Sequence, residues 1–152
     1  MSITRMLRLS LVVAFAMACS SDTISAPLRG LVYAAATAQC GPADGPAVAI
    51  YLTPNPVGSI EPIAPFVRVY VPVQLDQLTG RMWPIASGNT EAAAWFHPDA
   101  STYELAETGY MIVNSVDSES TITGLVDLHF PDAGHIRSQF RATWVPSHAL
   151  CG

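Results

Sequence analysis

Apolar and polar residues alternate most clearly along the last third of the chain, where strands are predicted at 110–116, 121–130 and 136–145. One face of the second strand carries four apolar residues: Ile122, Val126, Leu128 and Phe130. One face of the third strand carries another four: Ile136, Phe140, Ala142 and Trp144. Short polar segments join the three strands, so we expect an antiparallel meander.

The apolar faces of the last two strands also predict how these strands pair. Matching them places Phe130 opposite Ile136 and Val126 opposite Phe140, around a five-residue turn at 131–135. A register offset by one residue would exchange the two faces, so this pairing is a direct test of the pattern.

The same register arranges the polar face of the predicted hairpin. His129 then lies opposite Arg137, and Asp127 lies diagonal to Arg137 and Arg141. Diagonal neighbours on one face are close enough for long side chains to interact. We therefore expect cross-strand charge pairing on this face.

Earlier segments predict further strands with a less regular pattern. Residues 48–52 alternate, and the valines of 66–73 share one face, whereas 53–65 contains four prolines and predicts a long loop. The segment 74–98 is the least regular. Within it, 89–96 fits either one or two helical turns or a strand, and the surrounding β pattern favours a strand. The predicted fold is all-β: an antiparallel β-sandwich or small β-barrel with a C-terminal three-stranded meander.

The first residues have the pattern of a bacterial export signal. Arg5 and Arg8 precede an apolar run at 9–18, which is too short to span a membrane as a mature anchor. The segment 16–18, Ala-Met-Ala, then leads directly to Cys19. These residues resemble the bacterial lipobox, in which small or aliphatic residues precede a cysteine that is acylated and becomes the new N-terminus. The resemblance implies that Cys19 carries the lipid of a mature lipoprotein.

A second interpretation of the same residues remains open. A small-x-small sequence at 16–18 is also an ordinary site of secretory cleavage, which would leave Cys19 as a free thiol on a soluble secreted or periplasmic protein. We expect lipidation, because a cysteine directly after such a site is otherwise unusual in an exported chain. The predicted organisation is a signal peptide at 1–18, a lipidated tether at 19–27 and a single β-rich globular domain at 28–152.

Composition narrows the range of partners. The chain has 12 Asp and Glu residues, no lysine, and seven arginines. Five of these arginines lie after the signal peptide: Arg29, Arg68, Arg81, Arg137 and Arg141. A nucleic-acid partner needs a basic surface, and so acidic a domain predicts none. Half of the residues are hydrophobic, which argues against an intrinsically disordered chain.

Export also predicts the state of the other two cysteines. Thiols tend to pair outside the cytoplasm, and an acylated Cys19 leaves Cys40 and Cys151 for one disulfide. That bond would join the two ends of the domain; the alternative is two free buried thiols. Neither cysteine has Cys-x-x-Cys spacing, which argues against redox catalysis and against a zinc knuckle.

The C-terminal third resembles small exported bacterial lipoproteins of uncharacterised function. The likeness rests on the glycine-centred strand at 122–130, the Phe-Arg-Ala-Thr-Trp sequence at 140–144 and the terminal Cys151-Gly152. It covers roughly the last forty residues, with weaker similarity around Cys40-Gly41. The resemblance implies a β-rich envelope protein and assigns no catalytic residue.

Three residues around the predicted turn are candidate metal ligands: His129, Asp132 and His135. Both histidines are predicted on the polar face, and the sequence places no further strong ligand beside them. The pattern therefore favours exposed strand-end histidines over a metal site, and no cofactor is predicted. Of the remaining histidines, His97 is expected in a turn with Asp99, and His148 in the terminal tail.

The sequence favours binding over catalysis. Motifs of nucleophilic catalysis and of phosphate-binding glycine loops are absent from the sequence, so an enzyme is not favoured. Aromatic residues and arginines are predicted on outward faces or in loops: Tyr51, Arg68, Tyr70, Arg81 and Trp83. Such side chains stack on sugars or anchor a protein partner. For Tyr70 and Trp83, however, the favoured interpretation is that they complete a second core face.

The predicted function is a structural or interaction module of the bacterial cell envelope, anchored by the lipid on Cys19. Its expected partners are the membrane, through that lipid, and an envelope protein or glycan. The alternative is a small-ligand-binding or hydrolytic β-barrel domain in the periplasm. A cavity lined by converging polar groups would favour that alternative, whereas a filled core would argue against it.

Overall fold

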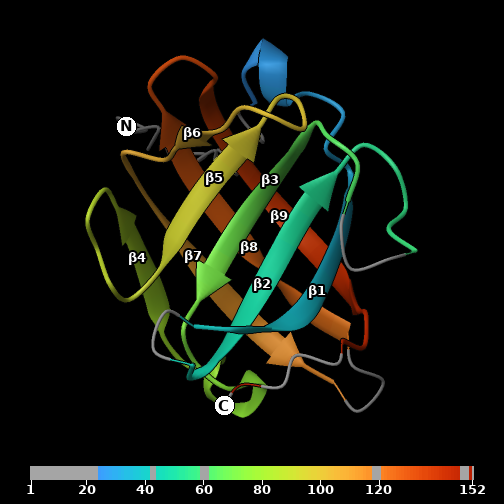
Figure 1. Ribbon diagram of the computed structural model, residues 1–152, viewed down its shortest axis with the longest axis vertical. Helices are drawn as coiled ribbons and strands as arrows, with labels where there is room; N and C mark the ends of the chain where they lie inside the picture. Colours follow the sequence, from blue (N-terminus) through green and yellow to red (C-terminus); the bar gives the residue numbers. More distant parts are fainter. Residues whose placement is uncertain (1–23, 42–43, 59–61, 118–120, 148–150, 152) are drawn as a thin grey trace, which may run out of the picture.

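A computed structural model describes residues 24–41, 44–58, 62–117, 121–147 and 151. Cys19, the expected signal peptide and His148 lie outside the described residues. The described chain is all-β, as predicted: nine strands form one mixed sheet that curls into a half-barrel (Figure 1). Nowhere in the described part is there a helix that is long and apolar enough to cross a membrane.

Two 3-10 turns accompany the nine strands: η1 (Ala26–Leu28) precedes the first strand, and η2 (Leu75–Gln77) lies between the third and the fourth. The strands in chain order are β1 (Tyr33–Cys40), β2 (Pro46–Thr53), β3 (Phe66–Val71), β4 (Met82–Ala86), β5 (Ala93–His97), β6 (Glu104–Leu105), β7 (Thr108–Val116), β8 (Thr121–Phe130) and β9 (Gly134–Trp144). Their order across the sheet is β4-β7-β8-β9-β1-β2-β3-β5-β6. Among these strands β1 and β9 pair in parallel, and the other neighbours are antiparallel. The curl places β5, β3 and β2 in front of β7, β8 and β9 in Figure 1.

Alternate residues of each strand fill the space between the two layers. The three valines of β3 are fully buried, and the apolar faces predicted for β8 and β9 also point into the core. Trp83 of β4 is buried as well, and its indole N–H donates to the carbonyl oxygen of Leu78 at 2.9 Å. Trp83 is therefore a core residue and not an outward-facing aromatic.

The least regular segment of the sequence contains two strands. Residues 93–97 form β5, which confirms the favoured interpretation of 89–96 in its second half. The preceding strand, β4, was not predicted, because Pro84 interrupts its pattern. Since β4 lies at one edge of the sheet, Pro84 is tolerated there without loss of a central ladder bond.

The register predicted for the last hairpin is wrong by two residues. Phe130 pairs with Gly134 and Gly124 with Phe140, because the turn has three residues, 131–133, and not five. Gly134 follows the turn at φ 87°, a left-handed conformation that favours glycine after a three-residue hairpin loop. A shift of two residues leaves every side chain on its predicted face but changes its partner across the strands.

The shorter turn rearranges the polar face of the hairpin. His129 pairs with His135, whereas it was expected opposite Arg137. Asp127 pairs directly with Arg137, to which it was expected to lie diagonal. The two histidines and the aspartate are therefore immediate neighbours on one face of β8 and β9.

Gly124 allows β7, β8 and β9 to pack closely. A Cβ atom at this position would lie 2.6 Å from the Phe140 ring and closer still to the carbonyl oxygen of Ile112. The glycine thus makes room for the Phe140 ring, which is almost fully buried over β8. This contact explains the glycine at the centre of an otherwise regular strand.

The chain is fastened near both ends of the half-barrel. Cys40 and Cys151 form the predicted disulfide, with Cα atoms 5.3 Å apart. At the other end, the Ser25 N–H donates to the carbonyl oxygen of His135 at 2.7 Å, and the Ser25 hydroxyl accepts from the His135 N–H at 2.8 Å. Leu28 of η1 is fully buried. The last residues of the expected tether therefore lie against β9.

Candidate functional site

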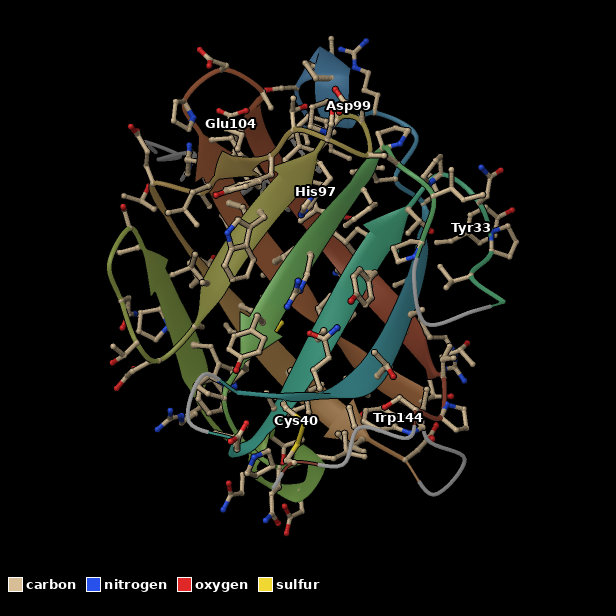
Figure 2. The ribbon with its side chains drawn as sticks, viewed as in Figure 1. Tyr33, Cys40, His97, Asp99, Glu104 and Trp144 are labelled. Atoms are coloured by element: carbon tan, nitrogen blue, oxygen red, sulfur yellow. A yellow bond between two sulfur atoms is a disulfide. The ribbon has the colours of Figure 1, made fainter. Side chains whose placement is uncertain are left out.

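The outward side of β2, β3 and β5 carries a surface that we call the aromatic face. Its members are Tyr51, Phe66, Arg68, Tyr70, Trp95 and His97. Strand pairing places Tyr51, Arg68 and Trp95 in one row across the three strands. Because the valines of β3 point inward, the residues between them must point outward. Figure 2 looks onto this side of the sheet, with His97 labelled near the end of β5.

Arg68 lies at the centre of the aromatic face, beside the rings of Tyr70 and Trp95, which also contact each other edge to face. Its guanidinium carbon is 5.2 Å from the centroid of the Trp95 ring and 5.8 Å from that of Tyr70. Both distances are within the range of cation–π attraction. The rings thus hold the only charged side chain among the members of the face.

A chain of hydrogen bonds orients the guanidinium. Arg68 Nη2 donates to Gln39 Oε1 at 2.7 Å, and Gln39 Nε2 donates to the Tyr51 hydroxyl oxygen at 2.7 Å. Gln39 belongs to β1 and reaches Arg68 across β2, where Ala49 carries only a methyl group. The small residue leaves room for the amide to cross the strand.

Within the described ranges, no carboxylate forms an ion pair with Arg68. In the described part of the chain, the ion pairs within 4.0 Å all involve Asp127, and none involves Arg68. Its Nε atom is buried without a hydrogen-bond partner, as is the Tyr70 hydroxyl. Burial raises the pKa of Tyr70, and the Arg68 guanidinium offsets part of this rise. The face therefore combines half-buried rings with a cation that has no anionic partner among the residues that the structure describes.

His97 extends the aromatic face toward the next loop. Its ring stacks on Phe66 with centroids 4.5 Å apart and lies 5.9 Å from the ring of Tyr103, which is exposed. Burial, and secondly the nearby Arg68 charge, lower the pKa of His97, so the ring is neutral at neutral pH.

Asp99 performs the turn role expected of it. Its carboxylate accepts hydrogen bonds from the backbone N–H and hydroxyl groups of Ser101 and Thr102, at 2.7 to 2.9 Å. The bond from the Thr102 hydroxyl is the largest of the causes that hold the pKa of Asp99 well below its usual range. Asp99 therefore shapes the loop beside His97 and leaves the aromatic face without a carboxylate.

The structure divides the five residues that the sequence selected for binding. Tyr51, Arg68 and Tyr70 share the aromatic face, whereas Trp83 is in the core. Arg81 covers the buried Trp83, with its guanidinium carbon 3.7 Å from the ring centroid. Arg81 is therefore outside the aromatic face.

The sequence pattern did not single out four contributors to this face: Gln39, Phe66, Trp95 and His97. Trp95 and His97 alternate with the buried Ala94 and Phe96, which is a strand pattern. Their place beside Arg68 depends on the pairing of β3 with β5, which nothing in the local sequence indicates. Gln39 is harder still to identify, because it acts across an intervening strand.

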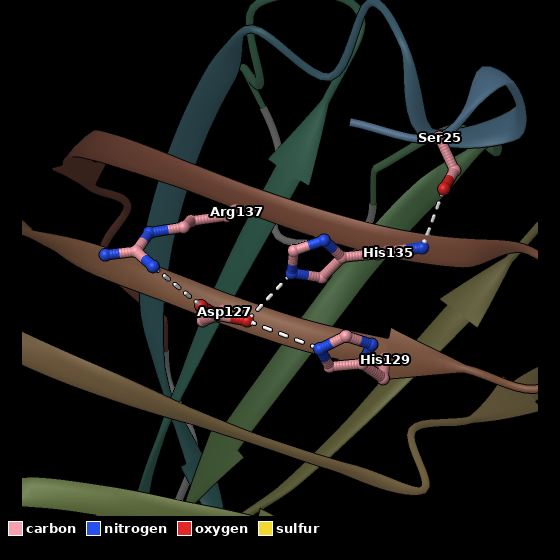
Figure 3. A network of polar contacts seen from close by, with 5 residues as sticks. All are labelled: Ser25, Asp127, His129, His135 and Arg137. Carbon is pink, nitrogen blue, oxygen red and sulfur yellow. Dashed lines mark hydrogen bonds and ion pairs between the residues drawn. The ribbon is translucent and has the colours of Figure 1, made fainter. Parts of the chain in front are cut away.

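The metal-ligand candidates are only partly brought together. His129 and His135 are adjacent, and the residue that joins them is Asp127, in place of the expected Asp132 (Figure 3). Asp132 lies in the turn beyond the last pair of the ladder, where its backbone N–H donates to the Glu104 carboxylate. Glu104 thus supports the turn.

The concave side of the half-barrel offers no support for a barrel-interior ligand site. The described side chains that fill it form one continuous apolar core. The hollows found are open to solvent; one lies along β1 and β9, and another lies at the 53–63 loop. We therefore look for a binding site on the outside of the sheet.

No protein-family model, curated protein or solved structure matches the chain.

Proposed function

We propose that the chain is a lipid-anchored protein of the bacterial cell envelope that binds acidic saccharides on its aromatic face. The observation that carries the proposal is Arg68, held against the Tyr70 and Trp95 rings without a carboxylate partner among the described residues. Two features support a saccharide ligand: the rings supply a surface for stacking, and the guanidinium supplies a positive charge.

The rings supply a surface for stacking. Aromatic side chains bind ligands through large, rigid contact areas, and sugar rings present C–H groups that pack on such surfaces. Trp95 and Tyr70 are half-buried, so their neighbours hold them in place while part of each remains accessible. Little side-chain freedom is then lost on binding.

The charge selects an acidic ligand. A guanidinium binds a carboxylate through paired N–H donors, and such charge-assisted bonds are stronger than neutral ones. Arg68 is one of few cations in an acidic chain and already lies in a fixed orientation through Gln39. A ring that carries a carboxylate satisfies both the stacking surface and the guanidinium.

The proposed anchor would define how the domain approaches the membrane. Ile24 forms a bridge with Ile136 of β9, and five residue steps separate it from Cys19. An extended chain spans at most about 3.6 Å per residue, so a lipid on Cys19 would keep Ile24 within about 18 Å of the membrane surface. The aromatic face would then lie on the side of an upright half-barrel, accessible to a glycan beside the membrane.

Saccharide binding can be tested by calorimetry with an oligogalacturonate as the acidic probe and a malto-oligosaccharide as the neutral one. We expect preferential binding of the acidic probe. Arg68→Gln should reduce that affinity at least about tenfold, the equivalent of one charge-assisted bond. Trp95→Ala should weaken both probes, because it removes stacking surface. Arg81→Gln is the matched control, since Arg81 covers a core tryptophan elsewhere.

Two results would contradict the saccharide proposal. One is equal binding of acidic and neutral probes by the wild-type chain. The other is an equal loss of affinity in Arg68→Gln and Arg81→Gln, which would indicate non-specific attraction to any surface cation.

The anchor needs a separate test, intact-mass analysis of the N-terminus of the purified protein. A mature chain that begins at an acylated Cys19 supports lipidation, whereas an unmodified Cys19 or another start refutes it. A pull-down from native membranes comparing wild type with Cys19→Ala then tests the tether. Identical partners and identical fractionation in the two samples would remove the envelope-tether hypothesis.

A further inference from the structure

We propose that Asp127, His129 and His135 form a binding site for a divalent late first-row transition-metal ion, with Zn²⁺ as the test case. The site lies on the outward side of the β8–β9 hairpin. It is independent of the saccharide proposal, because it uses other strands and other residues.

The hairpin places the three side chains together. His129 and His135 are directly paired across β8 and β9, and Asp127 precedes His129 by two residues on the same face. Directly opposite residues and next neighbours along one face are the closest side chains that a sheet offers. The two imidazole rings accordingly stack, with centroids 4.1 Å apart and planes inclined by 9°.

One carboxylate oxygen is the meeting point of both rings. Asp127 Oδ1 lies 2.8 Å from His135 Nε2 and 3.7 Å from His129 Nε2 (Figure 3). One potential ligand atom from each of the three residues lies within 4.8 Å of the other two. Ligands around a tetrahedral zinc ion sit about 2.0–2.2 Å from the metal, so neighbouring ligand atoms are roughly 3.3 Å apart. Small side-chain rotations would bring the three atoms to that spacing.

Two contacts hold the ligands without occupying the meeting point. Arg137 Nη1 lies 3.5 Å from Asp127 Oδ2, the carboxylate oxygen that faces away from the histidines. Ser25 makes two hydrogen bonds with the backbone of His135, which leaves the imidazole uninvolved. Such supporting contacts orient ligands and strengthen metal binding.

The three side chains differ in exposure in a way that suits metal entry. The side chains of Asp127 and His135 are 13% and 24% exposed, whereas that of His129 is 56% exposed. The first two therefore form a fixed pair, and His129 is free to close on an ion. An ion bound there would have three protein ligands and a remaining position open to water.

The donor set selects the class of metal. Two imidazole nitrogens and one carboxylate oxygen suit zinc, copper and nickel, whereas magnesium and calcium prefer oxygen ligands alone. The 2.8 Å contact is a hydrogen bond from His135 Nε2–H to the carboxylate when no metal is bound. Metal binding at Nε2 requires the other neutral tautomer of His135, with the proton on Nδ1.

The test is calorimetric titration of the exported protein with ZnCl₂, using a Cys19→Ala background to remove a thiol that would bind the same ion. We expect one equivalent of Zn²⁺ to bind and Mg²⁺ not to bind. Losing a group that merely supports a metal ligand typically costs 10–100-fold in affinity, so His135→Ala and Asp127→Asn should each cost at least about tenfold. His97→Ala is the matched control and should bind zinc as the background does, because His97 lies on the aromatic face.

A second readout does not depend on the variants folding. In NMR spectra of the background protein, Zn²⁺ should shift the imidazole resonances of His129 and His135 and leave those of His97 unchanged. Absence of zinc binding at millimolar concentration would overturn the proposal. So would zinc affinity that survives in folded His135→Ala, or imidazole shifts at other histidines only.

Discussion

The aromatic face and the histidine cluster of β8 and β9 (Asp127, His129 and His135) lie on the same outward side of one sheet, but their charged groups have different surroundings. Arg68 is surrounded by rings and an amide, with no carboxylate in reach among the described residues. One carboxylate oxygen of Asp127 contacts Arg137, and the other contacts both histidines. The first region offers a cation to a broad anionic ligand, and the second offers converging lone pairs to a small cation.

The contrast follows from how each pair of strands fills its outward rows. On β2, the outward residues Ala47 and Ala49 are small, so Gln39 of β1 can reach across this strand to Arg68 of β3. On β8 and β9, medium-sized polar residues face each other directly and meet at their tips. One curled sheet thus presents an aromatic surface on one half and a compact polar cluster on the other.

The largest expected effect is on stability and concerns the disulfide, in which Cys40 directly follows Gln39 of the aromatic face. Replacing Cys40 and Cys151 by alanine should lower the free energy of unfolding by about 4–5 kcal/mol, because the bond closes a loop of more than a hundred residues. Denaturant unfolding measures this loss. Cys19→Ala is the control, and equal unfolding free energies in the two variants would contradict the assignment.

Around the histidine cluster, the free energy of unfolding should instead depend on how closely β7, β8 and β9 pack. Gly124→Ala should cost about 1–3 kcal/mol of unfolding free energy, because its Cβ would collide with the Phe140 ring and the Ile112 carbonyl. Gly45→Ala is the matched control, since a Cβ there meets nothing within 4 Å. A Gly124→Ala variant as stable as the control would show that β7, β8 and β9 are less tightly packed than described.

A smaller effect tests how the N-terminal segment supports the histidine cluster. Ser25→Ala removes the hydroxyl that accepts from the His135 N–H and should cost about 1 kcal/mol. Thermal unfolding and zinc titration of the same variant separate the two consequences. The interpretation requires a weaker zinc affinity in Ser25→Ala; an unchanged affinity would limit Ser25 to a structural role.

The smallest expected effect is a pH dependence of stability that comes from His97 on the aromatic face. Because the folded-state pKa of His97 is below its unfolded value of about 6.5, the unfolded chain binds more protons as the pH falls. The contribution of His97 to stability is therefore present above that pH and lost below it. Arg68→Gln should raise the pKa of His97, because it removes the nearby charge, as NMR titration would show. A His97 pKa that stays the same or falls in this variant would contradict the coupling.

The sequence predicted the parts of the molecule in which alternation is local. It identified β8 within its bounds, the inward faces of β8 and β9, and the pairing of Cys40 with Cys151. It did not predict the three-residue turn, since Pro131 and Gly134 fit longer turns equally well. That two-residue error separated Asp127 from the histidines and left Asp132 as the expected partner.

The aromatic face shows the other reason for incomplete prediction. Tyr51, Arg68 and Tyr70 could be selected from their own strands, because each alternates with buried residues. Trp95 joins them only through the pairing of β5 with β3. Gln39 joins them only because the small side chain of Ala49 lets it reach Arg68 across β2. These are long-range relations, and a periodic pattern within one segment carries no information about them.

The most direct test of the account is an NMR titration of the chain with the oligogalacturonate, observing the backbone amides, the Trp95 indole N–H and the Arg68 side-chain N–H groups. The account predicts saturable shifts at Trp95, Arg68 and Tyr70, with Ser25, Asp127 and His135 unchanged. Shifts confined to the β8–β9 hairpin, or none at Trp95 and Arg68, would contradict it.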